Sequence, residues 1–146
     1  MTVPSDIPTS TYRHRVRFYE TDAMGIVHHA NFLLFMENAR IAFLDEHDIP
    51  YLEYVERGLH FAVTKSQLEY RLPAHFDDQI EVSAWLALIR GASLRIEYEM
   101  RRGPDLLVTG ATEHAMVDAG GHPVRIPKER RDNLRKLAAR PIPTRT

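Results

Sequence analysis

Alternation of apolar and polar residues with a period of two predicts five strands along this chain. Such alternation is typical of a strand that buries one face and exposes the other. The last four predicted strands follow one another through short turns, such as the stretch RGPD, and strands joined in this way pair antiparallel. We therefore expect one antiparallel sheet of about five strands, covering residues 12–18, 61–72, 79–89, 92–101 and 106–117.

A long helix is predicted at residues 32–47, where apolar residues recur at the helical spacing of three and four. Its first turns are apolar almost all round, which is typical of a buried helix rather than one on a surface. Asn31 is a favourable N-cap residue, and Asp48 with Pro50 would end the helix. Two shorter helices are predicted, at residues 50–58 and 127–139.

Together these elements indicate an α+β fold in which one antiparallel sheet wraps around one buried helix. The 146 residues suggest a single domain, residues 1–146, with flexible tails at residues 1–10 and 140–146. A partner subunit is also expected, because one helix cannot cover both faces of the sheet. The surplus apolar residues that favour a homo-oligomer are Trp85, Ala87, Ile89, Leu107, Ala111, Ala115 and Val117.

Composition and charge argue against several functional classes. The 19 basic and 20 acidic side chains give a formal net charge of −1, whereas nucleic-acid or membrane-surface binding usually shows as a strong basic excess. Without cysteine, the chain has no disulfide, thiolate metal site or cysteine nucleophile. No apolar run approaches the roughly 20 residues that span a bilayer, and the N-terminus lacks the pattern of a secretory signal. We expect a cytoplasmic protein without a cofactor or bound metal.

The polar residues that could perform chemistry gather in the loop ahead of the long helix. Unpaired backbone N–H groups and a partial positive charge at a helix N-terminus can stabilise an oxyanion. A carboxylate nearby, such as that of Asp22, can attack a carbonyl or deprotonate a water. Gly25 gives the loop freedom to fold this carboxylate back over the helix start. The full set of candidates is Tyr19, Glu20, Thr21, Asp22, His28, His29 and Asn31.

Plainer interpretations of the same residues exist. Asp22 could cap a turn in the stretch TDAMG, and His28 and His29 could be solvent-exposed loop residues. A metal site built from these three residues is disfavoured, because adjacent histidines point apart and no further strong ligand follows.

The stretch FYETDAMGIVHHANFLLFMENAR, residues 18–40, resembles the signature of the 4-hydroxybenzoyl-CoA thioesterase family of hotdog-fold proteins. The shared pattern is an aspartate, a Gly-x-Val, a polar or aromatic pair, and then an asparagine and an aromatic residue that open the long helix. The stretches LEYRLPAHFDDQIEV and RGASLRIEYEMRR, residues 68–82 and 90–102, resemble later strands of that family. The resemblance covers roughly residues 12–137.

This resemblance implies a hotdog fold, a homodimer or homotetramer built edge to edge, and hydrolysis of an acyl-CoA thioester. The catalytic aspartate of the family falls on Asp22, and the backbone N–H donor at the helix start falls on or near His29. Candidate substrate-binding residues are Gly25 and His28 in the loop, and Arg90, which stands where some members contact the nucleotide phosphates. Some hotdog subfamilies use a glutamate as the base instead, which makes Glu37 an alternative base, although a solvated or salt-bridged residue is the commoner role for a helical glutamate.

The chain departs from the family in one respect. Members with a Tyr–Asp–His set place the tyrosine four residues before the aspartate, where this chain has Phe18, and Tyr19 follows one step later. Two other functions remain open. Hydrolysis of acyl groups from acyl carrier protein is disfavoured because no strongly basic recognition patch is evident. A non-catalytic acyl-CoA-binding module is disfavoured because Asp22 is intact.

Overall fold

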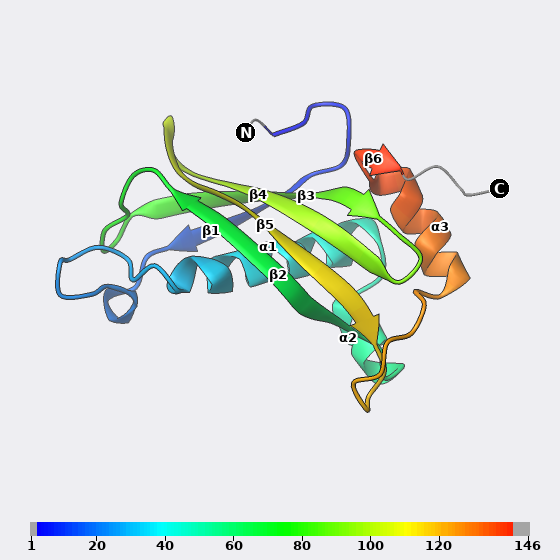
Figure 1. Ribbon diagram of the computed structural model, residues 1–146. Coiled ribbons are helices and arrows are strands. Elements are labelled where there is room, and N and C mark those ends of the chain that lie inside the picture. The colour runs from blue at the N-terminus through cyan, green and yellow to red at the C-terminus, as the bar shows by residue number, and fades with distance from the viewer. Residues whose placement is uncertain (1–2, 142–146) are drawn as a thin grey trace.

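The computed structural model describes residues 3–141 and shows one antiparallel sheet wrapped around one long helix, which confirms the predicted α+β fold (Figure 1). Figure 1 shows α1 beneath the sheet, with α2 and α3 near its C-terminal end. No helix among the described residues is long and apolar enough to cross a membrane. In chain order the elements are β1 (Ser10–Arg15), η1 (Phe18–Glu20), α1 (Asn31–His47), α2 (Tyr51–Glu56), β2 (His60–Tyr70), β3 (Gln79–Ile89), β4 (Ser93–Arg102), β5 (Asp105–Val117), α3 (Lys128–Leu137) and β6 (Arg140–Pro141).

The strand order is β1-β3-β4-β5-β2, so the expected pairing of every strand with its successor is wrong for β2 and β3. Instead β2 pairs with β5, and β1 pairs with β3. Residues 72–78, predicted as a simple turn, cross from one side of the sheet to the other. At one end the backbone N–H of Leu72 bonds to Leu107 of β5, and at the other that of Asp77 bonds to Val16. β1 and β2 therefore stand at the two ends of the strand order.

β1 ends at Arg15 rather than at residue 18. The chain leaves the sheet there because the Glu20 carboxylate accepts a hydrogen bond from the Arg17 backbone N–H at 2.6 Å, which closes the short 3-10 turn η1. Phe18, predicted to share a strand face with Val16, is consequently 75% exposed, whereas Val16 is buried.

The predicted tails are shorter in the structure. Ser10 is buried and already pairs with β3. At the other end, residues 140–141 pair in parallel with β3 and extend the edge that β1 begins. The remaining tail positions, residues 1–2 and 142–146, lie outside the described residues.

α1 begins one residue earlier than predicted, with Ala30 rather than Asn31 as its N-cap. The Asn31 side chain donates instead to the carbonyl oxygen of Glu20, at 2.8 Å, and so ties the helix start to the preceding loop. Leu33 and Leu34 are 37% and 55% exposed, so the apolar first turns are not covered completely within one chain. The buried face consists of Phe32, Phe35, Met36, Ala39, Phe43 and Leu44.

α1 packs most closely on β1 and β3. It also approaches β5 at Gly110, where a Cβ atom would lie 2.3 Å from Cε of Met36 and 2.7 Å from the backbone oxygen of Gln67. Only glycine fits so close a contact. The offset of α1 leaves β2 partly uncovered, and Val63 and Tyr70 of this strand are each 51% exposed.

The apolar residues on the second face of the sheet do not need a partner to cover them. A bulge between Leu86 and Leu88 changes the facing of β3, so that Ile89 joins the main core beside α1. The exposed large apolar side chains lie elsewhere. They include Phe18, Tyr19 and Met24 before α1, Leu34 on α1, Leu52 on α2, Val63 and Tyr70 on β2, and Phe76 in the crossover. The members of the predicted surplus that are buried within one chain are Trp85, Ala87, Ile89, Leu107 and Ala111.

A buried carboxylate joins the three helices where α1 ends. The Asp48 side chain has no exposed surface and accepts hydrogen bonds from Arg130 Nη1 at 2.9 Å, from Asn133 Nδ2 at 2.8 Å and from the Tyr54 hydroxyl. Burial and then this hydrogen bond raise the pKa of Tyr54, so its hydroxyl remains protonated and continues to donate. The prediction that Asp48 ends the helix therefore misses its larger role as the junction of α1, α2 and α3.

Replacing Asp48 should destabilise the fold. Asp48→Ala leaves the Arg130 guanidinium, 14% exposed, without its carboxylate, and breaking a buried pair typically costs about 3–5 kcal/mol. Urea unfolding of the purified protein measures this free energy. The control is Asp132→Ala, whose half-exposed carboxylate makes only long contacts and whose loss should change stability by less than about 0.5 kcal/mol. Equal effects of the two substitutions would contradict the role of Asp48.

Candidate active site

The loop between β1 and α1 is anchored by Glu20, whose side chain is only 10% exposed. Its carboxylate accepts from Arg17 and contacts His14 Nε2 at 2.8 Å. Its carbonyl oxygen accepts from the backbone N–H of His28, at 2.9 Å, and from Asn31 Nδ2. Glu20 thus connects the end of β1, both ends of the loop and the first turn of α1.

Asp22 opens a tight turn in this loop. Its carboxylate Oδ1 accepts from the Met24 backbone N–H at 2.8 Å, and its carbonyl oxygen accepts from Gly25 at 2.9 Å. Gly25 has a φ of +78°, a backbone conformation that favours glycine, so the turn needs a glycine at this position. Asp22 does cap a turn, as the plainer interpretation holds, but one hydrogen bond to Oδ1 leaves the second oxygen available.

The start of α1 presents a free donor beside Asp22. The backbone N–H of His29 donates no hydrogen bond to any described residue. Such an N–H near a helix N-terminus can stabilise negative charge that develops on a substrate oxygen. The Tyr70 hydroxyl donates to the His29 carbonyl at 3.2 Å and so helps to fix this peptide.

The two histidines do not point apart as expected. Their rings stack with centroids 4.4 Å apart, and the His28 ring is held by the Ala30 backbone N–H, which donates to Nδ1 at 3.3 Å. Among residues 3–141, no group of three or more histidines and carboxylates is close enough to hold a metal ion.

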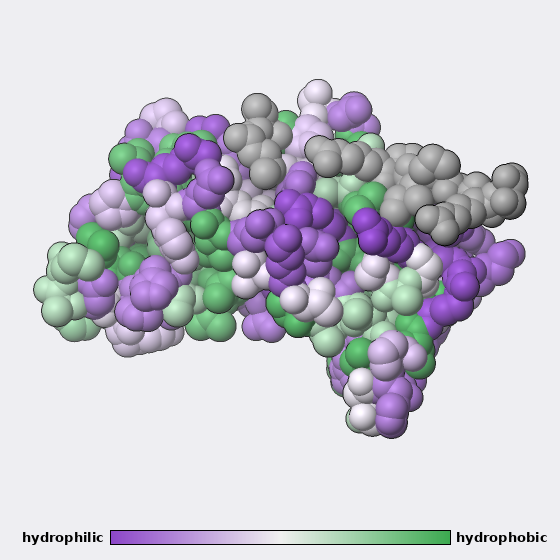
Figure 2. Space-filling view, in the orientation of Figure 1, coloured by the Kyte–Doolittle hydropathy of each residue, from purple (hydrophilic) through white to green (hydrophobic). Residues whose placement is uncertain are grey.

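One open cavity of about 310 Å³ brings these features together. Asp22 and His29 line it from the loop, Phe32 from α1 and Tyr70 from β2. Figure 2 shows apolar side chains exposed among polar ones at this end of the molecule, where Met24 is 76% exposed. The complete lining is Asp22, Met24, Ile26, Val27, His29, Phe32, Tyr70, Arg71, Leu72 and Pro73.

The other candidate residues lie outside this cavity. His28 neighbours His29 but does not line the cavity, and Gly25 lies at the tip of the turn. Arg90 lines a separate cavity with Thr64 and Ser93, just beyond the opposite end of β3, so one chain does not bring it to Asp22. Glu37, the alternative base, lines a third cavity farther along α1.

Tyr70 is the residue of the cavity that sequence reasoning missed. It was predicted only as one of the alternating residues of a strand. It reaches His29 because β2 is followed at once by the crossover, which runs beside the loop and bonds to it at Val27. The aromatic side chain at the end of a strand was the visible signal, but its neighbour depended on the strand order.

Comparison with known proteins identifies the family of this chain. Residues 16–134 match the model of the thioesterase-like superfamily. The chain belongs to this superfamily. An acyl-CoA thioesterase of Haemophilus influenzae is 32% identical over 117 residues, which are 79% of this chain and 86% of that protein. A solved structure of a Thermus thermophilus protein superposes with a TM-score of 0.86 at 34% identity, covering 91% of this chain and all of the other.

A second solved structure, of an Aquifex aeolicus protein, has a TM-score of 0.80 at 36% identity and covers 85% of this chain and 98% of the other. These findings confirm the predicted hotdog fold and the predicted enzyme class, a thioester hydrolase. The match is to the broad superfamily, and the narrower 4-hydroxybenzoyl-CoA thioesterase family remains a prediction.

The Glu20 anchor should be needed for the rate of hydrolysis. Glu20→Ala removes the side-chain contacts that fix the loop. A displacement of the Asp22 carboxylate by about 1 Å can lower the rate of hydrolysis by up to about 100-fold. We expect kcat for thioester hydrolysis to fall at least about tenfold, with Glu20→Gln intermediate because it keeps an acceptor for Arg17. The control is Glu81→Ala on the exposed face of β3. A normal kcat in Glu20→Ala would show that the anchor does not position the site.

Proposed function

We propose that this protein is an acyl-CoA thioesterase whose catalytic carboxylate is Asp22. The observation that carries the proposal is the single cavity in which the Asp22 side chain and the free backbone N–H of His29 lie together. A carboxylate and an N–H donor are the groups that thioester hydrolysis needs, one to supply or activate the nucleophile and one to hold the oxyanion. The acyl-CoA relatives support the choice of substrate class.

The carboxylate can act by two routes. In the first, Asp22 attacks the thioester carbonyl carbon, the C–S bond breaks, and the thiolate of CoA leaves and takes up a proton. Water then hydrolyses the acyl-aspartate anhydride to release the acid. In the second, Asp22 removes a proton from a water that attacks the same carbon, and this proton passes to the departing sulfur. In both routes the oxyanion accepts from the His29 N–H.

The other site residues support these groups. Tyr70 holds the His29 peptide through its carbonyl, and Gly25 allows the turn that presents Asp22. His28 packs against the His29 ring and so limits its movement over the cavity. These contacts favour positioning roles for Gly25, His28 and Tyr70.

The site is completed in a homodimer. β2 is an end strand, and one of its edges is unpaired among the described residues. Two apolar side chains, Val63 on β2 and Leu34 on α1, are more than half exposed. Antiparallel pairing of two β2 strands would continue the sheet and cover these side chains. It would also bring Arg90 of the partner subunit to the side of the molecule that carries Asp22, where a cation suits the phosphates of CoA. Further pairing of dimers would give a homotetramer.

Asp22→Asn should abolish most turnover and keep the fold. The amide retains the acceptor for the Met24 N–H but is neither a nucleophile nor a base, and loss of such a group typically costs about 10²–10⁴-fold in rate. Steady-state hydrolysis over short, long and aromatic acyl-CoAs, with thermal unfolding in parallel, measures both properties. The control is Asp6→Asn at an exposed position. Near-full activity of Asp22→Asn would sink the mechanism.

The same panel separates the alternatives. Matched acyl groups presented on CoA and on acyl carrier protein should show the higher kcat/KM with CoA. A reversed preference would assign the protein to acyl carrier protein, and binding of the whole panel without turnover would make it a non-catalytic module.

The wild-type protein should sediment as a dimer or a tetramer. Val63→Lys places a charge on the β2 side that the partner would cover, so this variant should shift towards the monomer and lose activity in parallel. The control is Thr11→Lys, an exposed position of β1 at the opposite end of the strand order from β2. Analytical ultracentrifugation distinguishes the species, and a fully active wild-type monomer would contradict a shared site.

A further inference from the structure

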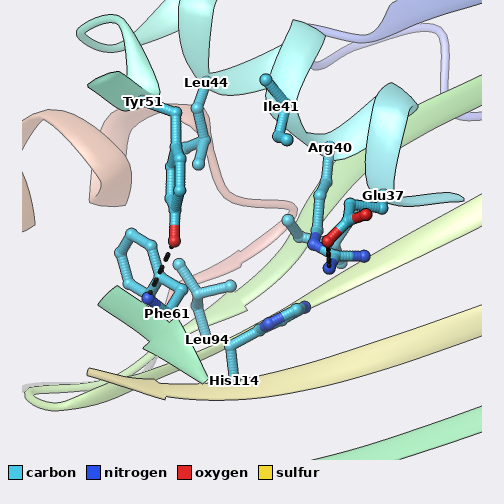
Figure 3. Close-up of a pocket in the computed structure, with 9 residues that line it drawn as sticks. Glu37, Arg40, Ile41, Leu44, Tyr51, Phe61, Leu94 and His114 are labelled. Atoms are coloured by element: carbon cyan, nitrogen blue, oxygen red, sulfur yellow. Dashed lines mark hydrogen bonds and ion pairs between the residues drawn. The ribbon is translucent and has the colours of Figure 1, made fainter. Parts of the chain in front are cut away.

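The cavity that Glu37 lines has a volume of about 80 Å³ and is more enclosed than the candidate active site. It lies between α1, the N-terminal end of α2 and the inner face of the sheet (Figure 3). Apolar residues such as Leu44, Phe61 and Leu94 form part of its walls, and polar groups supply about as much of the lining. Figure 3 shows the Arg40 side chain descending from α1 and the His114 ring rising from β5, so that both face the same space. A volume of this size would hold several water molecules or one small functional group of a ligand.

His114 is an unusual residue for the centre of a sheet. It is 1% exposed, and its Nε2 lies 2.7 Å from the Thr112 hydroxyl, which in turn lies 2.7 Å from the Tyr98 hydroxyl. No hydrogen bond of normal geometry reaches the other ring nitrogen, Nδ1, within residues 3–141, although the Phe61 backbone lies close enough to the ring to raise its pKa. Burial of an unpaired polar atom is costly, which argues that Nδ1 is there for a group that enters the cavity.

The charge of the cavity is balanced. Burial, and then the positive charge of Arg40, lower the pKa of His114 to about 4 against an opposing effect of the Phe61 backbone, so the ring is neutral near pH 7. Arg40 is 15% exposed and faces one carboxylate, that of Glu37, at 3.5 Å. One cation and one anion leave no net charge for a ligand to neutralise, so a neutral polar group suits the cavity better than an anion.

Hydrogen-bonding capacity remains on three sides of this space. The Tyr51 hydroxyl accepts from the Phe61 N–H at 3.2 Å and keeps its own proton to donate. Arg40 has five N–H donors; Glu37 engages one at 3.5 Å and the Tyr98 hydroxyl engages another. Together with His114 Nδ1, these groups can satisfy the oxygen of a hydroxyl or a carbonyl.

The cavity and the candidate active site lie along the same side of α1. Tyr70 lines the candidate active site and Phe61 lines the enclosed cavity, and both residues belong to the helix-facing side of β2. Leu33, Glu37 and Ile41, spaced by four residues, form one stripe of α1 between the two ends. At 1.5 Å per residue, Glu37 and Arg40 lie about 9–13 Å beyond Asn31 along the helix axis.

We propose that this cavity is a subsite for the distal end of the acyl group and that it selects acyl chains carrying a neutral oxygen there, as a hydroxyl or a carbonyl. The proposal rests on the acyl-CoA thioesterase function above. The span of about 9–13 Å corresponds to an aliphatic chain of about ten carbons, because an extended chain advances about 1.2 Å per bond. Arg40, His114 and Tyr51 are the specificity-determining residues.

The test compares decanoyl-CoA with ω-hydroxydecanoyl-CoA. Binding is measured by calorimetry on the Asp22→Asn protein, so that failure of hydrolysis and failure of the subsite remain distinguishable. We expect the hydroxylated chain to bind about tenfold more tightly, and kcat/KM of the active protein to show the same preference. Arg40→Met and Tyr51→Phe should each reduce the preference towards unity while decanoyl-CoA is bound within about twofold of the original affinity.

Two controls accompany these variants. Arg57→Met removes an exposed arginine from the end of α2 and should leave the preference unchanged. His114→Leu tests the buried nitrogen directly, and thermal unfolding checks that it folds; if it does not, the Arg40 and Tyr51 variants still decide. Equal affinity for the two chains in the Asp22→Asn protein, or a preference that survives both Arg40→Met and Tyr51→Phe, would overturn the subsite. Tighter binding of ω-carboxydecanoyl-CoA than of the hydroxylated chain would overturn its neutral character.

Discussion

The arrangement of the site depends on one buried carboxylate, that of Glu20. A buried carboxylate is costly unless its oxygens are hydrogen-bonded, and here His14 and the Arg17 backbone provide the contacts. The carbonyl oxygen of the same residue receives His28 and Asn31. Because β1, the loop and the first turn of α1 all meet at Glu20, few loop conformations are compatible with satisfying it. Its position therefore determines where the neighbouring loop residues lie relative to the helix start.

The second constraint is the lateral position of α1. The helix lies over β1 and β3. It approaches β5 closely at Gly110, where a larger residue would not fit. The core is tightly packed where α1 covers the sheet. The half of the sheet beside β2 is less covered, and side chains there remain exposed. Both cavities that contact α1 lie on that less covered half. The space proposed to bind a substrate is thus in large part a consequence of where the helix packs.

These constraints explain how far sequence patterns could predict the molecule. β3 coincides with the predicted residues 79–89, and α1 starts one residue from its predicted position, because apolar periodicity reports which local face is buried. Alternation does not report which strand pairs with which. The sequence therefore predicts a turn at residues 72–78, where the structure has a crossover. Asp22 and His29 could be proposed together since both lie in one short loop. Tyr70, Arg40 and His114 could not be assigned to cavities, because their neighbours come from distant parts of the chain.

The unpaired edge of β2 and the open side of the site lie together, so one partner could cover both. Oxyanion stabilisation by a backbone N–H is strongest where water is excluded, since protein dipoles then act in a lower dielectric. Within one chain the Tyr70 side chain is 51% exposed and the His29 side of the cavity is open to solvent. Closure by a second copy along β2 would dry the site, satisfy the strand edge and cover exposed apolar side chains in one step. In such a dimer, association of the subunits would exclude water from the site before substrate arrives.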